Sequence, residues 1–197
     1  PNSILLFLYI IILVCREVFI MSNLPKVIVK DKEDIRTNHI NWDEYFMSIA
    51  ILSSLRSKDT STKVGAAIVS DEHKVLSLGY NGMPIGIDDS KIPWAREGVN
   101  ELDTKYPYVC HAELNAILNT ERRLKGSTLY VTLFPCNECA KAVIQAGIKK
   151  VIFLDDKYHD KTYSIASRKL FEMAGVETSQ YLGRVPQIDF GDMKYEL

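Results

Sequence analysis

The sequence has few cysteines, no long apolar run and no excess of charge of either sign, and each shortage disfavours a class of protein. Four cysteines among 197 residues are typical of a reducing compartment rather than of a disulfide framework. The 24 basic and 25 acidic residues give a net charge of −1, whereas nucleic-acid polymers require a basic surface. No internal repeat or low-complexity tract stands out, and 47% hydrophobic residues predict one well-cored domain.

The longest apolar run lies near the start of the chain, from Ile4 to Cys15. It is clearly shorter than the roughly 20 residues that a membrane helix needs. It has the length of a signal-peptide core, but no basic residue precedes it and no small-residue cleavage site follows. The chain opens on Pro1, and from Met21 it reads like the start of an ordinary cytosolic protein. We therefore expect residues 1–20 to be a non-native or disordered apolar leader; the alternative is a membrane anchor.

Composition divides the remainder into a flexible lead-in over residues 21–40, a domain over residues 41–190 and a tail over residues 191–197. The lead-in is charged and contains Pro25, whereas apolar periodicity begins directly after Asn41. We therefore expect a single folded domain that starts with a helix.

Within that domain, periodicity and turn residues predict the elements. Helices are expected over residues 42–55, 113–119, 137–146 and 164–174, and strands over residues 64–70, 74–82, 128–134 and 150–154, with weak strand signals after residue 176. Residues 84–109 form a long connection, which in a compact domain is usually functional. The order predicts an α/β fold, a three-layer α/β/α sandwich with a mixed sheet between helical layers.

Three donors that suit zinc stand in the pattern His-x-Glu … Pro-Cys-x-x-Cys: His111, Cys136 and Cys139. Imidazole nitrogen and thiolate sulfur are ligands that Zn²⁺ takes in tetrahedral sites. The two cysteines are three residues apart at the start of a predicted helix, so they share one face, where the helix dipole lowers a thiol pKa. Three protein ligands leave the fourth position to water, which is typical of a catalytic site.

Glu113 lies two residues beyond the histidine, poorly placed as a fourth ligand but able to reach that water. Two thiolates cancel the charge of zinc, so the water is acidified less than at a three-histidine site, where its pKa is about 7. A neighbouring base is then needed, and we predict that Glu113 supplies it. The alternative is a closed structural site with Cys110 as fourth ligand. Because adjacent residues rarely point the same way, we expect Cys110 to be a small buried cysteine instead.

The order and spacing of these motifs resemble the zinc nucleobase deaminases, for which the His-x-Glu … Pro-Cys-x-x-Cys signature is known. From Trp42 to Phe190 the chain is similar to the deoxycytidylate deaminases, a branch of the cytidine deaminase superfamily. The segments that carry the resemblance are residues 57–59, 64–66, 79–84, 102–113, 133–139 and 156–160. Gly-Tyr-Asn-Gly-Met-Pro and Lys-Tyr-His-Asp narrow it to the deoxycytidylate branch. Residues 1–20 have no counterpart in the family.

The resemblance implies a central mixed sheet of about five strands and one Zn²⁺ per chain, held by His111, Cys136 and Cys139. It implies hydrolytic deamination of dCMP to dUMP and ammonia in the cytoplasm, with Glu113 moving protons, which supplies dUMP for thymidylate synthesis. It further implies a homohexamer that is activated by dCTP, bound with Mg²⁺, and inhibited by dTTP. Neither nucleic-acid polymers nor membranes are expected as partners.

The resemblance also assigns substrate contacts. It places Asn81 against the sugar, Tyr158 against the base or phosphate, and Ala112 in the substrate site. From the residues alone, Asn-Gly is about as often a turn, and Tyr158 could equally be an aromatic at the edge of the core. The 5′-phosphate needs cationic or hydroxyl partners, for which the nearby candidates are Lys58, Ser61 and Lys63.

Other activities stay open at this point. A deaminase of free cytidine and a tRNA adenosine deaminase share the zinc signature, although the net charge of −1 disfavours the tRNA enzyme. A catalytically inactive zinc-fold interaction protein is an alternative from a different class. The presence of Glu113 argues against it.

Overall fold

The computed structural model describes residues 36–188 and 191. Its contacts separate Pro1–His39 from Ile40–Leu197, and the second unit carries the elements given below. The expectations for residues 1–20, for most of the lead-in and for most of the tail lie outside the described residues, and the domain boundaries stay predictions. In the described part of the chain, no helix combines the length and the apolar character needed to cross a membrane.

Helices and strands follow the predicted order, with ends within about two residues of the predicted ends. The elements are α2 (Trp42–Ser54), β1 (Gly65–Val69), β2 (Val75–Tyr80), α3 (Ala112–Leu118), β3 (Thr128–Leu133), α4 (Asn137–Gln145), β4 (Lys150–Asp155), α5 (Thr162–Ala174) and β5 (Glu177–Gln180). Asn41 caps α2 in a capping box with Glu44, and Gly175 ends α5 in the left-handed conformation. The long connection contains two short 3₁₀ helices, Asp89–Lys91 and Glu101–Asp103.

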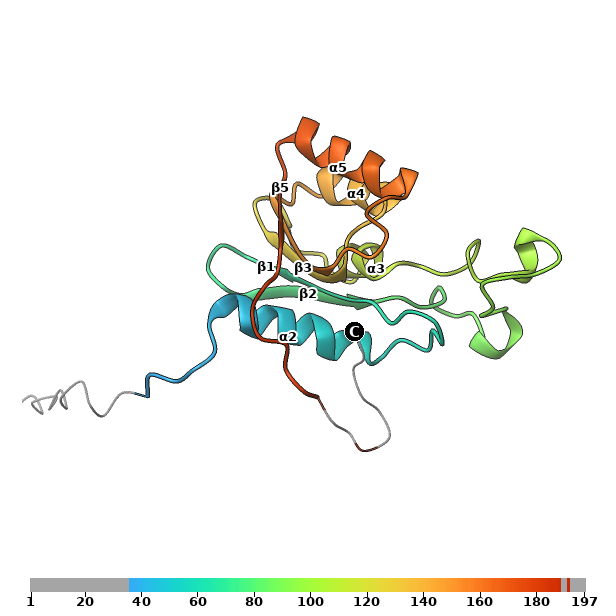
Figure 1. Ribbon diagram of the computed structural model, residues 1–197, viewed down its shortest axis with the longest axis horizontal. Helices are drawn as coiled ribbons and strands as arrows, with labels where there is room; N and C mark the ends of the chain where they lie inside the picture. The colour runs from blue at the N-terminus through green and yellow to red at the C-terminus, as the bar shows by residue number, and fades with distance from the viewer. Residues whose placement is uncertain (1–35, 189–190, 192–197) are drawn as a thin grey trace, which may run out of the picture. The chain divides into compact units, whose positions relative to one another are not determined.

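The strands form one mixed sheet in the order β2-β1-β3-β4-β5. β1 pairs antiparallel with β2 and β3, whereas β3, β4 and β5 run parallel to one another. In Figure 1, α2 lies on one side of the sheet and α4 and α5 lie on the other. The predicted three-layer α/β/α sandwich with a five-stranded mixed sheet is therefore confirmed.

Each face of the sheet has its own apolar core because side chains alternate along the strands. Ala66 and Ile68 of β1 pack in the core that α3, α4 and α5 share, and Ala67 and Val69 pack in the core under α2. The same alternation continues through β3 and β4. The central strands β1, β3 and β4 are thus buried on both faces, and the loops at the ends of the strands are free to carry polar side chains.

Close contact holds α3 against β2. A Cβ at Gly79 would lie 2.2 Å from the carbonyl oxygen of Ala112 and 2.4 Å from the nitrogen of Ala116. Side chains cannot approach backbone atoms so closely, so only glycine allows this packing. The start of α3, where His111 is the N-cap, is therefore fixed next to the end of β2.

Candidate active site

Because of the strand register, four loops meet where the strands end on one side of the sheet. Gly65 at the start of β1 pairs with Tyr80 at the end of β2, and Leu133 at the end of β3 pairs with Asp155 at the end of β4. The segments that precede β1 and follow β2, β3 and β4 thus lie together. In α/β folds, ligands bind at such carboxyl ends of strands.

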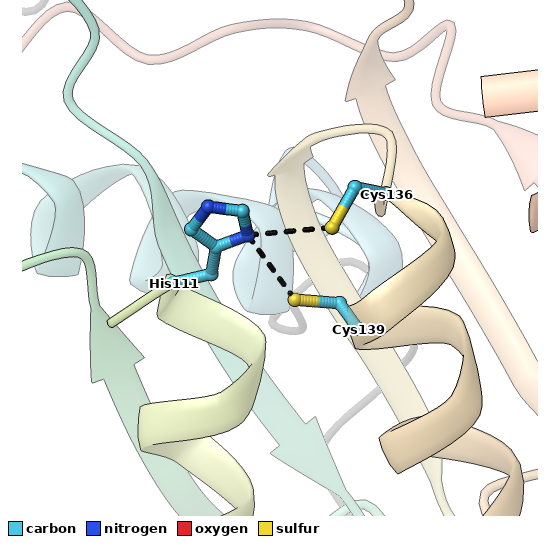
Figure 2. A group of neighbouring side chains, drawn as sticks. All are labelled: His111, Cys136 and Cys139. Atoms are coloured by element: carbon cyan, nitrogen blue, oxygen red, sulfur yellow. Dashed lines mark hydrogen bonds between the residues drawn. The ribbon is translucent and has the colours of Figure 1, made fainter. Parts of the chain in front are cut away.

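His111, Cys136 and Cys139 converge at these strand ends as predicted. His111 is the N-cap of α3 and Cys136 is the N-cap of α4, and Figure 2 shows the three side chains pointing toward one another. His111 Nδ1 lies 3.4 Å from each sulfur, and all three ligand atoms lie within 4.8 Å of one another. Tetrahedral zinc with usual bond lengths requires nitrogen and sulfur to lie about 3.5 Å apart. The three donors therefore fit zinc, with Nδ1 as the ligating nitrogen.

Cys110 does not belong to this group of three donors. Its backbone bridges to Gly82, as an extended residue next to His111 would. The expectation that Cys110 is buried is wrong, because its side chain is half-buried. The bridge puts Cys110 at the rim of the core rather than inside it.

The three ligands hold their protons unequally. Hydrogen bonding by Cys139, and then by His111, lowers the pKa of Cys136 to about 4 although burial opposes it. The hydrogen bond to Cys136, followed by burial, raises the pKa of Cys139, and a hydrogen bond to Cys136 raises the pKa of His111 to about 9. Zinc requires thiolates and neutral imidazole, so its binding at these residues would release the protons that they hold.

Glu113 lies in the first turn of α3 and is 4% exposed. Burial raises the pKa of its carboxyl, and the charge of His111 opposes that shift. A carboxyl with a raised pKa exchanges protons more readily near neutral pH than an ordinary glutamate does. The structure therefore places a group suited to proton transfer next to the three ligands.

His111, Cys136 and Glu113 line a pocket of about 350 Å³, and Cys139 is buried beside it. Of the predicted substrate residues, Asn81, Ala112 and Tyr158 line it as well. Lys58 and Ser61 are not in its lining: Lys58 pairs with Asp89 on the surface, and the Ser61 N–H donates to the Asp59 carboxylate. Their substrate contacts stay predictions without support from the pocket.

Sequence reasoning missed several polar residues of the pocket, chiefly Asp59, Arg96, Lys105 and Tyr106. Asp59 and Lys105 form an ion pair whose side chains are 2% and 7% exposed, and Arg96 Nε donates to the Tyr106 hydroxyl over 3.2 Å. Three of the four come from the long connection. The length of that connection was one signal, and the resemblance in residues 57–59 and 102–113, which include Asp59, Lys105 and Tyr106, was another.

Comparison with known proteins gives the family. The sequence model described as the cytidine and deoxycytidylate deaminase zinc-binding region matches residues 40–155. This chain belongs to that family. The match includes His111, Cys136 and Cys139, which are therefore its zinc-binding residues.

The family's members include relatives similar to this chain over most of their length. The deoxycytidylate deaminase of Homo sapiens is 55% identical over 154 residues, which cover 78% of this chain and 86% of the relative. The probable deoxycytidylate deaminase of Drosophila melanogaster is 47% identical over 158 residues, covering 77% and 76%. A crystal structure of the dCMP deaminase of cyanophage S-TIM5 in complex with dCMP and dUMP superposes with a TM-score of 0.57 at 30% identity, covering 73% of this chain and 100% of that one.

We expect one zinc ion per chain. Elemental analysis of the purified protein should give a zinc-to-chain ratio near one, and Cys136→Ser should lower it sharply because a serine hydroxyl is a poor zinc ligand. Cys110→Ser is the matched control and should keep the ion. Loss of zinc from Cys110→Ser would contradict the three-ligand assignment.

Proposed function

We propose that this protein catalyses the hydrolytic deamination of dCMP to dUMP and ammonia and thereby supplies dUMP for thymidylate synthesis. The observation that carries the proposal is that the zinc-binding residues converge at one pocket, which His111, Cys136 and buried Glu113 line. The names of the human and Drosophila relatives, and the dCMP and dUMP in the cyanophage structure, support dCMP as the substrate.

Bound at His111, Cys136 and Cys139, zinc would supply a Lewis acid that makes water nucleophilic at C4 of cytosine. Glu113 accepts a proton from the attacking water and passes a proton to N3 of the ring. It then delivers a proton to the amino group that leaves as ammonia. One water is consumed, and the C4–N bond is exchanged for a C4–O bond.

The walls of the pocket suit a flat base. Val64, Phe134 and Tyr158 contribute apolar surface near Glu113. Phe134 is held by Phe153, with ring centroids 4.8 Å apart, and by Arg168, whose guanidinium lies 4.2 Å from the centroid of the Phe134 ring. Apolar walls exclude bulk water, which strengthens electrostatic interactions at the reacting atoms.

Arg96 is the cation we propose for the 5′-phosphate. It lines the pocket together with Tyr158, and its Nε donates to the Tyr106 hydroxyl. No carboxylate of the described residues forms an ion pair with it, whereas the charge of Lys105 is neutralised by Asp59. Arg96 can therefore offer its planar fork of donors to a phosphate.

We further propose that the enzyme is a cytoplasmic homohexamer activated by dCTP, bound with Mg²⁺, and inhibited by dTTP. The resemblance to deoxycytidylate deaminases supports these properties. Apolar side chains left exposed on α2 and on the edge strand β2 support association between subunits: Tyr45, Leu52, Leu78 and Tyr80. The low cysteine content agrees with the cytoplasm.

The substrate class is tested by ammonia release from dCMP, deoxycytidine and a tRNA anticodon stem, each with and without dCTP and dTTP. We expect turnover of dCMP, little of deoxycytidine and none of the tRNA stem, because a phosphate site left empty leaves its donors unpaired. dCTP should raise the dCMP rate at low substrate, and dTTP should lower it. Equal rates on dCMP and deoxycytidine without any response to the triphosphates would identify a nucleoside deaminase instead.

A further inference from the structure

Asp59 is a buried carboxylate outside the catalytic group that joins two walls of the pocket. Its Oδ1 accepts hydrogen bonds from the N–H groups of Ser61 (2.8 Å) and Thr62 (3.1 Å) and from Lys105 Nζ (2.7 Å). Its Oδ2 accepts from Asn81 Nδ2 (3.2 Å) and also lies against Lys105 Nζ. One side chain thus connects the loop before β1, the residue after β2 and the connection that leads to His111.

Burial makes this arrangement costly to break. Asp59 and Lys105 are 2% and 7% exposed, and removal of one partner of such a pair leaves an uncompensated charge in the interior. The pair is neutral as a whole. Its role is therefore not to attract an anion but to hold the groups around it.

Asn81 is the pocket residue whose side-chain amide Asp59 helps to orient. Its side-chain Oδ1 accepts from Val64 N–H over 2.8 Å, and its Nδ2 donates to Thr62 O over 3.0 Å and to Asp59. Both amide hydrogens are thus engaged, whereas the carbonyl oxygen has a second lone pair. A flipped amide would place NH₂ against the Val64 N–H and the carbonyl against Asp59. The network therefore permits a single orientation.

The backbone of Asn81 is fixed independently of Asp59. Its N–H donates to Val64 O over 3.1 Å, and its carbonyl accepts from Ser57 Oγ over 2.8 Å. Loss of the Asp59 carboxylate therefore leaves the residue in place but removes one acceptor of Asn81 Nδ2 and the acceptor of the Thr62 N–H. Only the bonds to Thr62 O and from the Val64 N–H then hold the amide, on a loop that has itself been loosened. Because Asn81 lines the pocket, rotation of the loosened amide changes what a ligand meets.

We infer that Asp59 is a positioning residue that locks the Asn81 amide with its carbonyl oxygen available to the ligand, so that this position accepts a hydrogen bond from a sugar hydroxyl and offers no donor. The inference rests on the proposed function, since dCMP supplies the hydroxyl. On this inference the sugar hydroxyl determines specificity through Asn81, and Asp59 controls that contact without touching the hydroxyl.

The test compares the wild-type protein with Asp59→Asn on two substrates, one with and one without the sugar hydroxyl. The kcat/KM of the zinc-loaded protein is measured for dCMP and for 2′,3′-dideoxycytidine monophosphate, which lacks the hydroxyl donor. The wild-type protein should prefer dCMP by roughly 5- to 10-fold, as expected for one neutral hydrogen bond. In Asp59→Asn the new amide group faces Asn81 Nδ2 and Lys105 Nζ, both donors, so the preference should fall to about one.

Asp89→Asn is the matched control, because it removes a carboxylate from the exposed pair with Lys58 and should keep the wild-type preference. Zinc content and thermal melting check that Asp59→Asn is folded. The double variant Asp59→Asn/Lys105→Met removes both buried charges, so it leaves neither unpaired, and should lose the preference as well.

Three outcomes separate the hypotheses. Failure of the wild-type protein to deaminate dCMP would refute the proposed function. Turnover of dCMP with no preference over the dideoxy compound would show that Asn81 does not accept from the sugar. A wild-type preference that persists in both Asp59 variants, with only the melting temperature lowered, would show that Asp59 is purely structural.

Discussion

Glu113→Gln is expected to keep the zinc ion and the fold but to lose turnover of dCMP by about 10²- to 10⁴-fold, the usual contribution of a positioned acid–base group. Glutamine has the shape of glutamate, so the packing of this buried side chain changes little. It cannot accept a proton, so it can pass none to the ring or to the leaving ammonia. The measurement is kcat for ammonia release, alongside zinc content and the melting temperature.

Glu72→Gln is the matched control for that experiment. Glu72 lies in the turn between β1 and β2, where its exposed carboxylate pairs with Lys74, and this exchange should leave kcat unchanged. Near-normal turnover in Glu113→Gln would mean that another group moves the protons. Loss of zinc in that variant would instead mean that Glu113 holds the metal site together.

The fold and the zinc centre could be predicted because their signals are local. Cys136 and Cys139 share one helical turn, and His111 stands at the start of another, so short-range spacing contains most of the geometry. β1 is apolar along its whole length, as expected of a strand that helices cover on both faces, and all five of its residues are buried. Only the approach of His111 to the two cysteines depends on the fold, and strand order supplies it.

The polar lining of the pocket could not be predicted in the same way. Asp59 and Lys105 are 46 residues apart. Neither position shows a periodicity or a spacing that would indicate a buried ion pair. Lys58 stands near the motifs in the sequence, but the structure pairs it with Asp89 outside the pocket. Arg96, further from any motif, lines the pocket instead. Proximity to a motif along the chain therefore does not show which loop residues line the pocket.

Arg96 is therefore the residue whose loss should convert the specificity of the enzyme. Arg96→Met keeps much of the aliphatic length but removes the donors and the charge. Hydrogen bonds to a charged partner contribute about 1.5–3 kcal/mol, so kcat/KM for dCMP should fall roughly 10- to 150-fold at 1.4 kcal/mol per factor of ten. The slow turnover of deoxycytidine, which has no phosphate, should stay as it is.

Two comparisons make that result specific. Arg122→Met removes an exposed arginine that is not in the pocket lining, and it should change neither substrate. Lys58→Met tests the competing assignment made from the sequence. If Lys58→Met carries the loss for dCMP and Arg96→Met does not, the phosphate binds at Lys58 rather than at Arg96. An equal loss for dCMP and deoxycytidine in Arg96→Met would mean that the guanidinium supports Tyr106 and Tyr158 rather than the phosphate, because only a phosphate contact distinguishes the two substrates.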